Sequence, residues 1–170
     1  MSPLLTFLQA ACLAAFAGLL VVAAWQDLRT MRIANTVSIA IVAVFAIWAL
    51  AGLASGRMTV GGLGWALACG LGVFGAGALL FVVGALGGGD VKLLAAASLF
   101  AGPAWLTDLL LVMAFGGGAM GFAVLCGLPI GPSAPGNGST VAARLRGGLP
   151  YGPAIAAGGL WTAFNLIQAT

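Results

Sequence analysis

The sequence predicts an all-α fold, a polytopic membrane helix bundle with about six transmembrane segments, the fourth of them short or re-entrant. Of the 170 residues, 62% are hydrophobic and 5% are charged, and the mean hydropathy is +1.18. A soluble domain carries about 25% charged residues, so this chain has too few charges to cover a water-facing surface. We therefore expect a single integral-membrane domain over residues 1–170.

Long apolar runs separated by short polar or glycine-rich stretches predict the individual spans. A membrane-crossing helix needs about 20 predominantly apolar residues. Five runs approach or reach this length, at 4–25, 36–53, 60–83, 105–125 and 151–167. The run 92–102, which Pro103 ends, is too short to cross and is expected to start inside the bilayer or to re-enter. The stretch 127–150 is rich in glycine and proline and is predicted to be a loop.

Small residues recur one helical turn apart in the third predicted span, at Gly64, Ala68, Gly72 and Ala76. Small side chains at this spacing let helix backbones approach closely in lipid. We therefore expect this stripe to be a packing face between helices.

The basic residues predict the orientation of the bundle. If the loops after the first, third and fifth spans share one side, that side holds five of the six basic residues, namely Arg29, Arg32, Lys92, Arg144 and Arg146. The other side holds only Arg57. These three loops are therefore expected in the cytoplasm, with both chain ends outside. Asp27 and Asp90 then lie on the cytoplasmic side, and Asp108 lies on the far side.

Missing residue types exclude several chemistries. The sequence has no histidine and no glutamate, which excludes a Ser-His-Asp triad, a Cys-His pair and an HExxH zinc site. The three cysteines are far apart and form no CxxC pair. We therefore expect no metal and no cofactor. The net charge of +3 is too small to indicate a nucleic-acid partner.

Asp27 and Asp90 are the candidate reactive residues, although each could also have a purely structural role. Asp27 follows the first span closely, and it could simply pair with Arg29 or Arg32 at the membrane boundary. Asp90 follows three glycines and opens an apolar run, so it could simply cap a helix. The glycines remove side chains where another backbone must approach closely.

Taken together, the two aspartates indicate acid–base chemistry. Two carboxylates that share a poorly solvated site cannot easily both ionise, so such a pair holds one shared proton near neutral pH. One carboxylate can then activate a water molecule while the other donates a hydrogen bond to a carbonyl group. The sequence shows only that both residues can reach the same side of the membrane.

Three segments resemble motifs of the type IV prepilin peptidases, which are GxGD aspartic membrane proteases. Gly87-Gly88-Gly89-Asp90-Val91-Lys92-Leu93 resembles their GxGD motif. Asp27 with Arg32-Ile33-Ala34-Asn35 resembles their first motif, although Ala34 replaces the usual proline. The segment 150–158 resembles their last-helix motif, and the three segments occur in the family's order.

The resemblance implies an aspartic endopeptidase of the bacterial inner membrane, with periplasmic termini and a site facing the cytoplasm. It implies that Asp27 and Asp90 are the catalytic pair, and that the substrates are prepilins or pseudopilins with a short basic leader and an apolar helix. The small chain without CxxC pairs resembles the short, peptidase-only branch that serves Flp pili, the CpaA or TadV type. No methyltransferase activity is therefore expected, and membrane lipid is the other expected partner.

Six further residues are expected to shape the site or bind substrate: Gly87, Gly88, Gly89, Lys92, Asn35 and Tyr151. Purely structural roles remain open for two of these residues, because Lys92 could anchor a membrane boundary and Asn35 could cap the second helix. The rival function is a small transporter or channel subunit in which Asp27 and Asp90 bind an ion or a proton. A third possibility is a membrane scaffold without catalysis.

Overall fold

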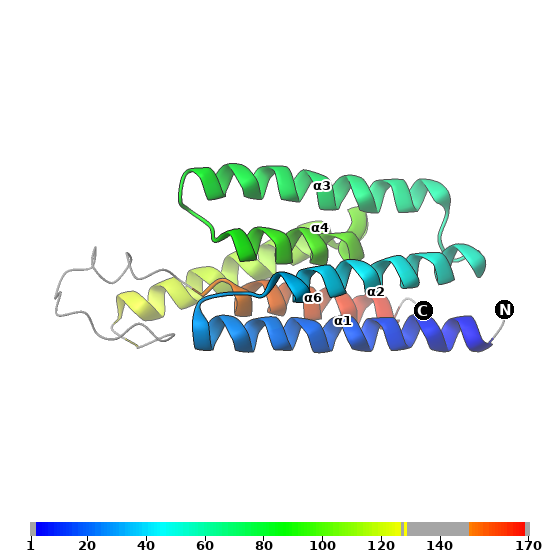
Figure 1. Ribbon diagram of the computed structural model, residues 1–170, viewed down its shortest axis with the longest axis horizontal. Coiled ribbons are helices and arrows are strands. Elements are labelled where there is room, and N and C mark those ends of the chain that lie inside the picture. Colours follow the sequence, from blue (N-terminus) through cyan, green and yellow to red (C-terminus); the bar gives the residue numbers. More distant parts are fainter. Residues whose placement is uncertain (1–2, 127, 129–149, 169–170) are drawn as a thin grey trace.

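The computed structural model describes residues 3–126, 128 and 150–168, and these residues form an all-helical bundle without strands. The helices are α1 (Pro3–Thr30), α2 (Asn35–Ala54), α3 (Val60–Val82), α4 (Gly88–Leu125) and α6 (Gly152–Gln168). They lie side by side along one long axis (Figure 1). The predicted all-α class is therefore confirmed.

The expected number of spans is not supported by the structure. Four of the five described helices, α1 to α4, are long and apolar enough to cross a membrane. The runs 92–102 and 105–125, predicted as separate segments, are two helical arms that share the label α4 and are separated by a kink at Gly102. The last helix, α6, is 17 residues long. The predicted loop 127–150, which includes Arg144 and Arg146, lies outside the described residues except for Leu128 and Pro150.

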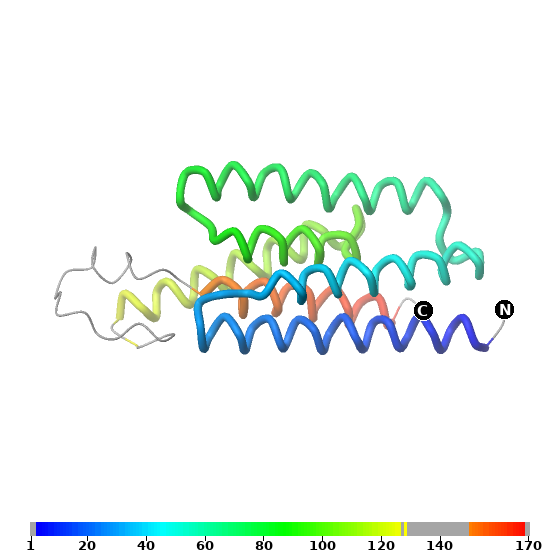
Figure 2. Tube along the Cα trace, in the orientation of Figure 1, coloured from blue at the N-terminus to red at the C-terminus, as the bar shows by residue number. Residues whose placement is uncertain are grey.

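A sharp break divides α4 at Gly102, where φ is 52° and ψ is −164°. Pro103 disfavours a helical conformation at the residue before it, and glycine adopts a positive φ at little cost. Figure 2 shows the chain running along the bundle and then turning back at this point. The first arm of α4, residues 88–101, is about 20 Å long at 1.5 Å per residue, which is shorter than a hydrocarbon core of about 30 Å.

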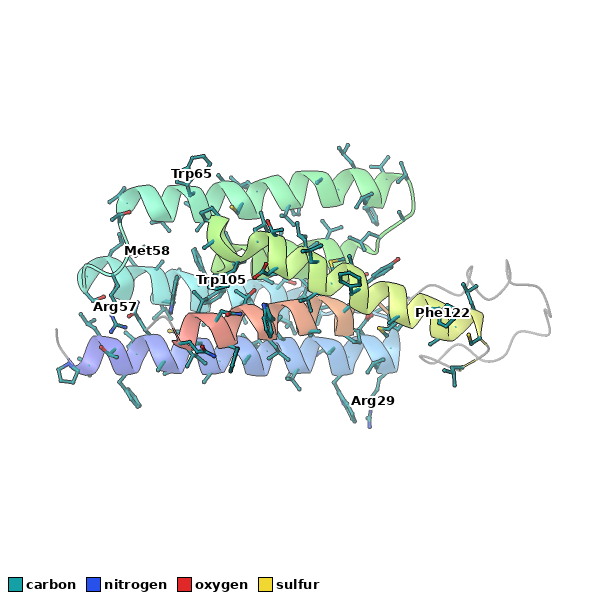
Figure 3. The ribbon with its side chains drawn as sticks, turned by 180° about the vertical axis from the view of Figure 1, so that it is seen from behind. Arg29, Arg57, Met58, Trp65, Trp105 and Phe122 are labelled. Atoms are coloured by element: carbon teal, nitrogen blue, oxygen red, sulfur yellow. The ribbon has the colours of Figure 1, made fainter. Side chains whose placement is uncertain are left out.

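The antiparallel course gives the bundle two distinct ends. The turns 31–34 and 83–87 and the start of α6 lie at one end, which also holds Asp27 and Asp90; we call it the aspartate end (Figures 1 and 2). The turn 55–59 lies at the opposite end, and the first arm of α4 turns back before it reaches that end (Figure 2). Figure 3 shows Arg29 at the aspartate end and Arg57 at the opposite one.

Aromatic side chains hold the middle of the bundle together. Phe16 of α1 stacks on Phe100 of α4 with ring centroids 4.1 Å apart, and Phe45 of α2 meets Phe100 edge-on at 5.3 Å. All three rings are buried. Such pairs add about 0.5–1.5 kcal/mol beyond the burial of their area. This cluster fixes the first arm of α4 against α1 and α2.

The predicted small-residue stripe on α3 is not its packing face within this chain. Gly64, Ala68, Gly72 and Ala76 are exposed, and a Cβ added at Gly64 or Gly72 would meet nothing within 4 Å. The close approach between α3 and α4 instead uses other glycines. A Cβ added at Gly70 would lie 2.5 Å from a methyl group of Leu99. Small residues recur one turn apart on two faces of α3, and the sequence alone does not show which face is buried. The predicted face was therefore the wrong one.

Gly158→Ala is expected to destabilise the protein by about 1–3 kcal/mol, the usual cost of overpacking. A Cβ at Gly158 would lie 2.6 Å from the carbonyl oxygen of Leu109, so α6 must move away from α4. Thermal unfolding in detergent measures the effect. The matched control is Gly64→Ala, which adds the same methyl group where nothing lies within 4 Å. Equal melting temperatures for the two variants would contradict the close α4–α6 contact.

Candidate active site

Asp27 lies in the last turn of α1 and is held by the start of α6. Its side chain is buried, with 4% of the residue exposed, and its Oδ2 accepts a 2.7 Å hydrogen bond from the backbone N–H of Gly152. A carboxylate at the C-terminal end of a helix is disfavoured by that helix's dipole. The N-terminal end of α6 offsets this cost, because its free N–H points at the carboxylate.

Gly152 allows this contact because it has no side chain. A Cβ added there would lie 2.6 Å from the Cβ of Asp27 and 2.8 Å from its Oδ2. Gly152 was not among the residues predicted from the sequence to shape the site. The available signal was a glycine between Tyr151 and Pro153 at a predicted helix start, within the last-helix motif.

Asp90 is the third residue of α4 and carries an unpaired oxygen. Its carboxylate accepts a hydrogen bond from the backbone of Gly87, the residue that caps the helix. A Cβ at Gly87 would lie 2.6 Å from Asp90 Oδ2, so the glycine makes room for the carboxylate. The other oxygen, Oδ1, is buried and has no hydrogen-bond partner. A buried polar atom without a partner is costly, and such atoms are often found where a ligand or water binds.

The structure brings Asp27 and Asp90 together at the aspartate end. The two carboxylates interact electrostatically, and only 8% of Asp90 is exposed. A buried pair of like charges favours a state in which one proton is shared between them. Within the described part of the chain, no group of three or more His, Cys, Asp or Glu residues could hold a metal ion.

The glycine loop before Asp90 is closely surrounded. A Cβ at Gly89 would lie 3.3 Å from the Cβ of Ile33, in the turn after α1, and one at Gly88 would lie 3.4 Å from the ring of Phe81 in α3. Ile33 belongs to the segment that resembles the first family motif, whereas Phe81 was not expected near the site. A side chain at Gly89 would therefore be tight against Ile33, whereas a Cβ at Gly88 would make ordinary van der Waals contact with Phe81.

Lys92 and Asn35 contact each other rather than the aspartates. Lys92 Nζ donates a 2.9 Å hydrogen bond to Asn35 Oδ1, and both residues are exposed. Two residues along a helix correspond to a rotation of about 200°, so Lys92 faces away from Asp90. Tyr151 precedes the glycine that binds Asp27, and its ring lies against Gly117, where an added Cβ would be 3.2 Å from the ring.

The turn after α1 keeps a proline-like shape although it lacks proline. Ala34 has φ −66° and ψ 134°, values that a proline also adopts. Its N–H donates to Oε1 of Gln26 at 3.2 Å, a bond that proline could not make. The departure from the family motif at Ala34 therefore leaves the backbone in the conformation that proline would favour.

Comparison with known proteins gives one finding. The model of the type IV leader peptidase family matches residues 14–125, a segment that contains both Asp27 and Asp90. The segment 150–158 lies beyond this match. No match was found among curated proteins or among solved structures. The match covers more than half of the chain and agrees with the motifs around both aspartates, so the chain belongs to the type IV leader peptidase family.

Proposed function

We propose that this protein is an aspartic endopeptidase that removes the short leader from Flp-type prepilins or pseudopilins. The observation that carries the proposal is the buried pair Asp27 and Asp90, which a member of a leader peptidase family brings together at one end of a helix bundle. The sequence has no histidine or glutamate that could supply the acid–base chemistry instead.

The hydrogen bonds of the two carboxylates support different roles for them. Asp27 accepts an N–H from the start of α6, which stabilises its negative charge. Asp90 has an unpaired buried oxygen, which is better suited to carry the shared proton. Asp27 is therefore the general base, and protonated Asp90 is the hydrogen-bond donor.

The proposed reaction begins when Asp27 takes a proton from water. The water oxygen attacks the scissile carbonyl carbon, and Asp90 gives its proton to the carbonyl oxygen. Asp90 then takes back a proton from one hydroxyl of the tetrahedral intermediate. The C–N bond breaks, Asp27 protonates the leaving amine, and the leader keeps the new carboxyl group.

The distribution of basic residues supports a cytoplasmic site in the bacterial inner membrane. Among the described basic residues, Arg29, Arg32 and Lys92 lie at the aspartate end, and Arg57 lies at the opposite end. Positive charge favours the cytoplasmic side. The first residues of α1 lie at the opposite end, which is periplasmic in this orientation, and α6 runs from the aspartate end toward it (Figure 1).

The cysteine pattern supports a peptidase without methyltransferase activity. The larger relatives that also methylate carry paired CxxC motifs in a cytoplasmic segment. The three cysteines of this sequence form no CxxC pair.

Co-expression with an Flp-type prepilin tests the proposal, with leader removal scored by gel shift. Wild type should cleave, the double variant Asp27→Asn/Asp90→Asn should not, and the control Asp108→Asn should cleave normally. A folded wild type that cleaves none of several prepilins would defeat the proposal in favour of an ion site. Cleavage by the double variant would show that the aspartates are not the catalytic pair.

A further inference from the structure

An apolar groove runs along the outside of the bundle, between α2 and α3, with the first arm of α4 as its floor. Its volume is about 600 Å³, which lies within the usual range of ligand sites. The first arm contacts both neighbouring helices (Figure 1). Side chains on the groove walls are open to the surroundings, with 45% of Val42 and 71% of Leu71 exposed.

The polarity of the side chains that line the groove changes along its length. Lys92 and Asn35 lie at the aspartate end, joined by their hydrogen bond. Ser38 follows one helical turn deeper, and beyond it the α2 wall continues with Ile39 and Val42. The order from the membrane surface inward is therefore a cation, a hydroxyl and then hydrocarbon.

Ser38 is the most unusual group in the groove. It is 6% exposed, and its hydroxyl has no hydrogen-bond partner. A buried hydroxyl without a partner costs about 1–3 kcal/mol, so a ligand that supplies an acceptor would recover this loss. A purely hydrocarbon ligand has no acceptor for this hydroxyl and would not recover the loss.

Two geometric facts argue against the substrate's transmembrane helix as the occupant. The α4 lining runs only from residue 92 to residue 99, about 10 Å at 1.5 Å per residue, which is less than one leaflet of a bilayer. The groove also lies on the face of α4 opposite to Asp90. A peptide in the groove would have to pass around α4 to reach the two carboxylates.

We propose that the groove binds one anionic glycerophospholipid, with its phosphate at Lys92, an ester carbonyl at Ser38 and one acyl chain against Val42 and Leu71. The order of groups in such a lipid matches the order along the groove. Lys92 forms no ion pair with any described residue and uses one of its three N–H donors on Asn35, so two remain for a phosphate. The site is independent of catalysis.

Native mass spectrometry tests the site on protein released from nanodiscs of equimolar phosphatidylglycerol and phosphatidylcholine. Wild type should retain one phosphatidylglycerol in preference to phosphatidylcholine. Lys92→Gln should weaken this preference about fivefold, the usual contribution of one basic residue at an anionic surface. Arg57→Gln, the control at the opposite end, should not change it. Equal retention of both lipids by wild type would overturn the proposal.

Substitutions at two valines of similar exposure distinguish binding in the groove from binding to the rest of the lipid-facing surface. Val42→Trp fills the groove and should lower phosphatidylglycerol retention at least tenfold. Val21→Trp changes a similarly exposed valine on α1, outside the groove, and should have no effect. Leu71→Trp, from the opposite wall, should repeat the loss if Val42→Trp folds poorly. Equal retention in the groove variants and Val21→Trp would overturn the proposal.

Photo-crosslinking with p-benzoylphenylalanine at position 42, in the presence of an Flp-type prepilin, completes the test. Crosslinks to phosphatidylglycerol support the lipid site, and crosslinks to the prepilin helix would overturn it. The double variant Asp27→Asn/Asp90→Asn should give the same lipid result as wild type. The lipid site therefore fails or survives independently of the proposed peptidase function.

Discussion

Asp90→Asn is expected to slow leader cleavage by about 100-fold to 10,000-fold, the range that one positioned acid–base group contributes. The amide has nearly the size of the carboxyl group, and its oxygen can still accept the hydrogen bond from Gly87. The variant should therefore fold. It cannot exchange a proton with the substrate oxygen or share one with Asp27, so the chemical step is lost while the packing is retained.

The rate of leader removal from a purified prepilin in detergent measures the effect, with the melting temperature recorded beside it. Asp27→Asn should cost as much as Asp90→Asn, and the double variant should be little worse than either, because two groups that act as a unit are not additive. Asp108→Asn should leave the rate unchanged. Independent, multiplying losses at Asp27 and Asp90 would contradict a shared proton.

Gly152→Ala is expected to reduce cleavage about 10-fold to 150-fold, the equivalent of losing a hydrogen bond to a charged group worth about 1.5–3 kcal/mol. The added methyl group would lie 2.6 Å from the Cβ of Asp27, so the start of α6 must shift. The N–H of Gly152 then leaves Asp27 Oδ2, and the proposed general base loses both its orientation and part of its charge stabilisation.

Gly158→Ala is the informative comparison for Gly152→Ala, because both changes add a methyl group to α6 at a closely packed position. Gly158 meets α4 at Leu109 and lies about 9 Å from Gly152 along α6, at 1.5 Å per residue. Both variants should melt at lower temperature, but only Gly152→Ala should lower kcat at a temperature where both are folded. Equal kcat values would mean that Gly152 has no role in positioning Asp27.

Much of the fold follows from apolar length and from residues that end helices. The predicted spans 36–53 and 60–83 differ by one residue at each end from α2 (Asn35–Ala54) and by one residue in total from α3 (Val60–Val82). The placement of both aspartates at one end follows from the alternating direction of successive spans. These features depend on local composition and connectivity, which a single sequence contains.

The features that the sequence did not predict depend on contacts between distant segments. The exposed stripe at Gly64 and Gly72 has the same spacing as a packed one, and only the position of α4 decides which face is buried. The bond from Gly152 to Asp27 joins residues at opposite ends of the chain. Lys92, close to Asp90 in sequence, faces away from it because of the helical rotation.

The reversal at Gly102 has a consequence for how the protein would respond to bilayer thickness. A helix that crosses the whole membrane must tilt or deform the lipid when its length does not match the hydrocarbon core, which is hydrophobic mismatch. The first arm of α4 stops short of the opposite surface, so its depth is set by packing against Phe16, Phe45 and α3. The position of Asp90 relative to Asp27 is thereby decoupled from the thickness of the surrounding bilayer.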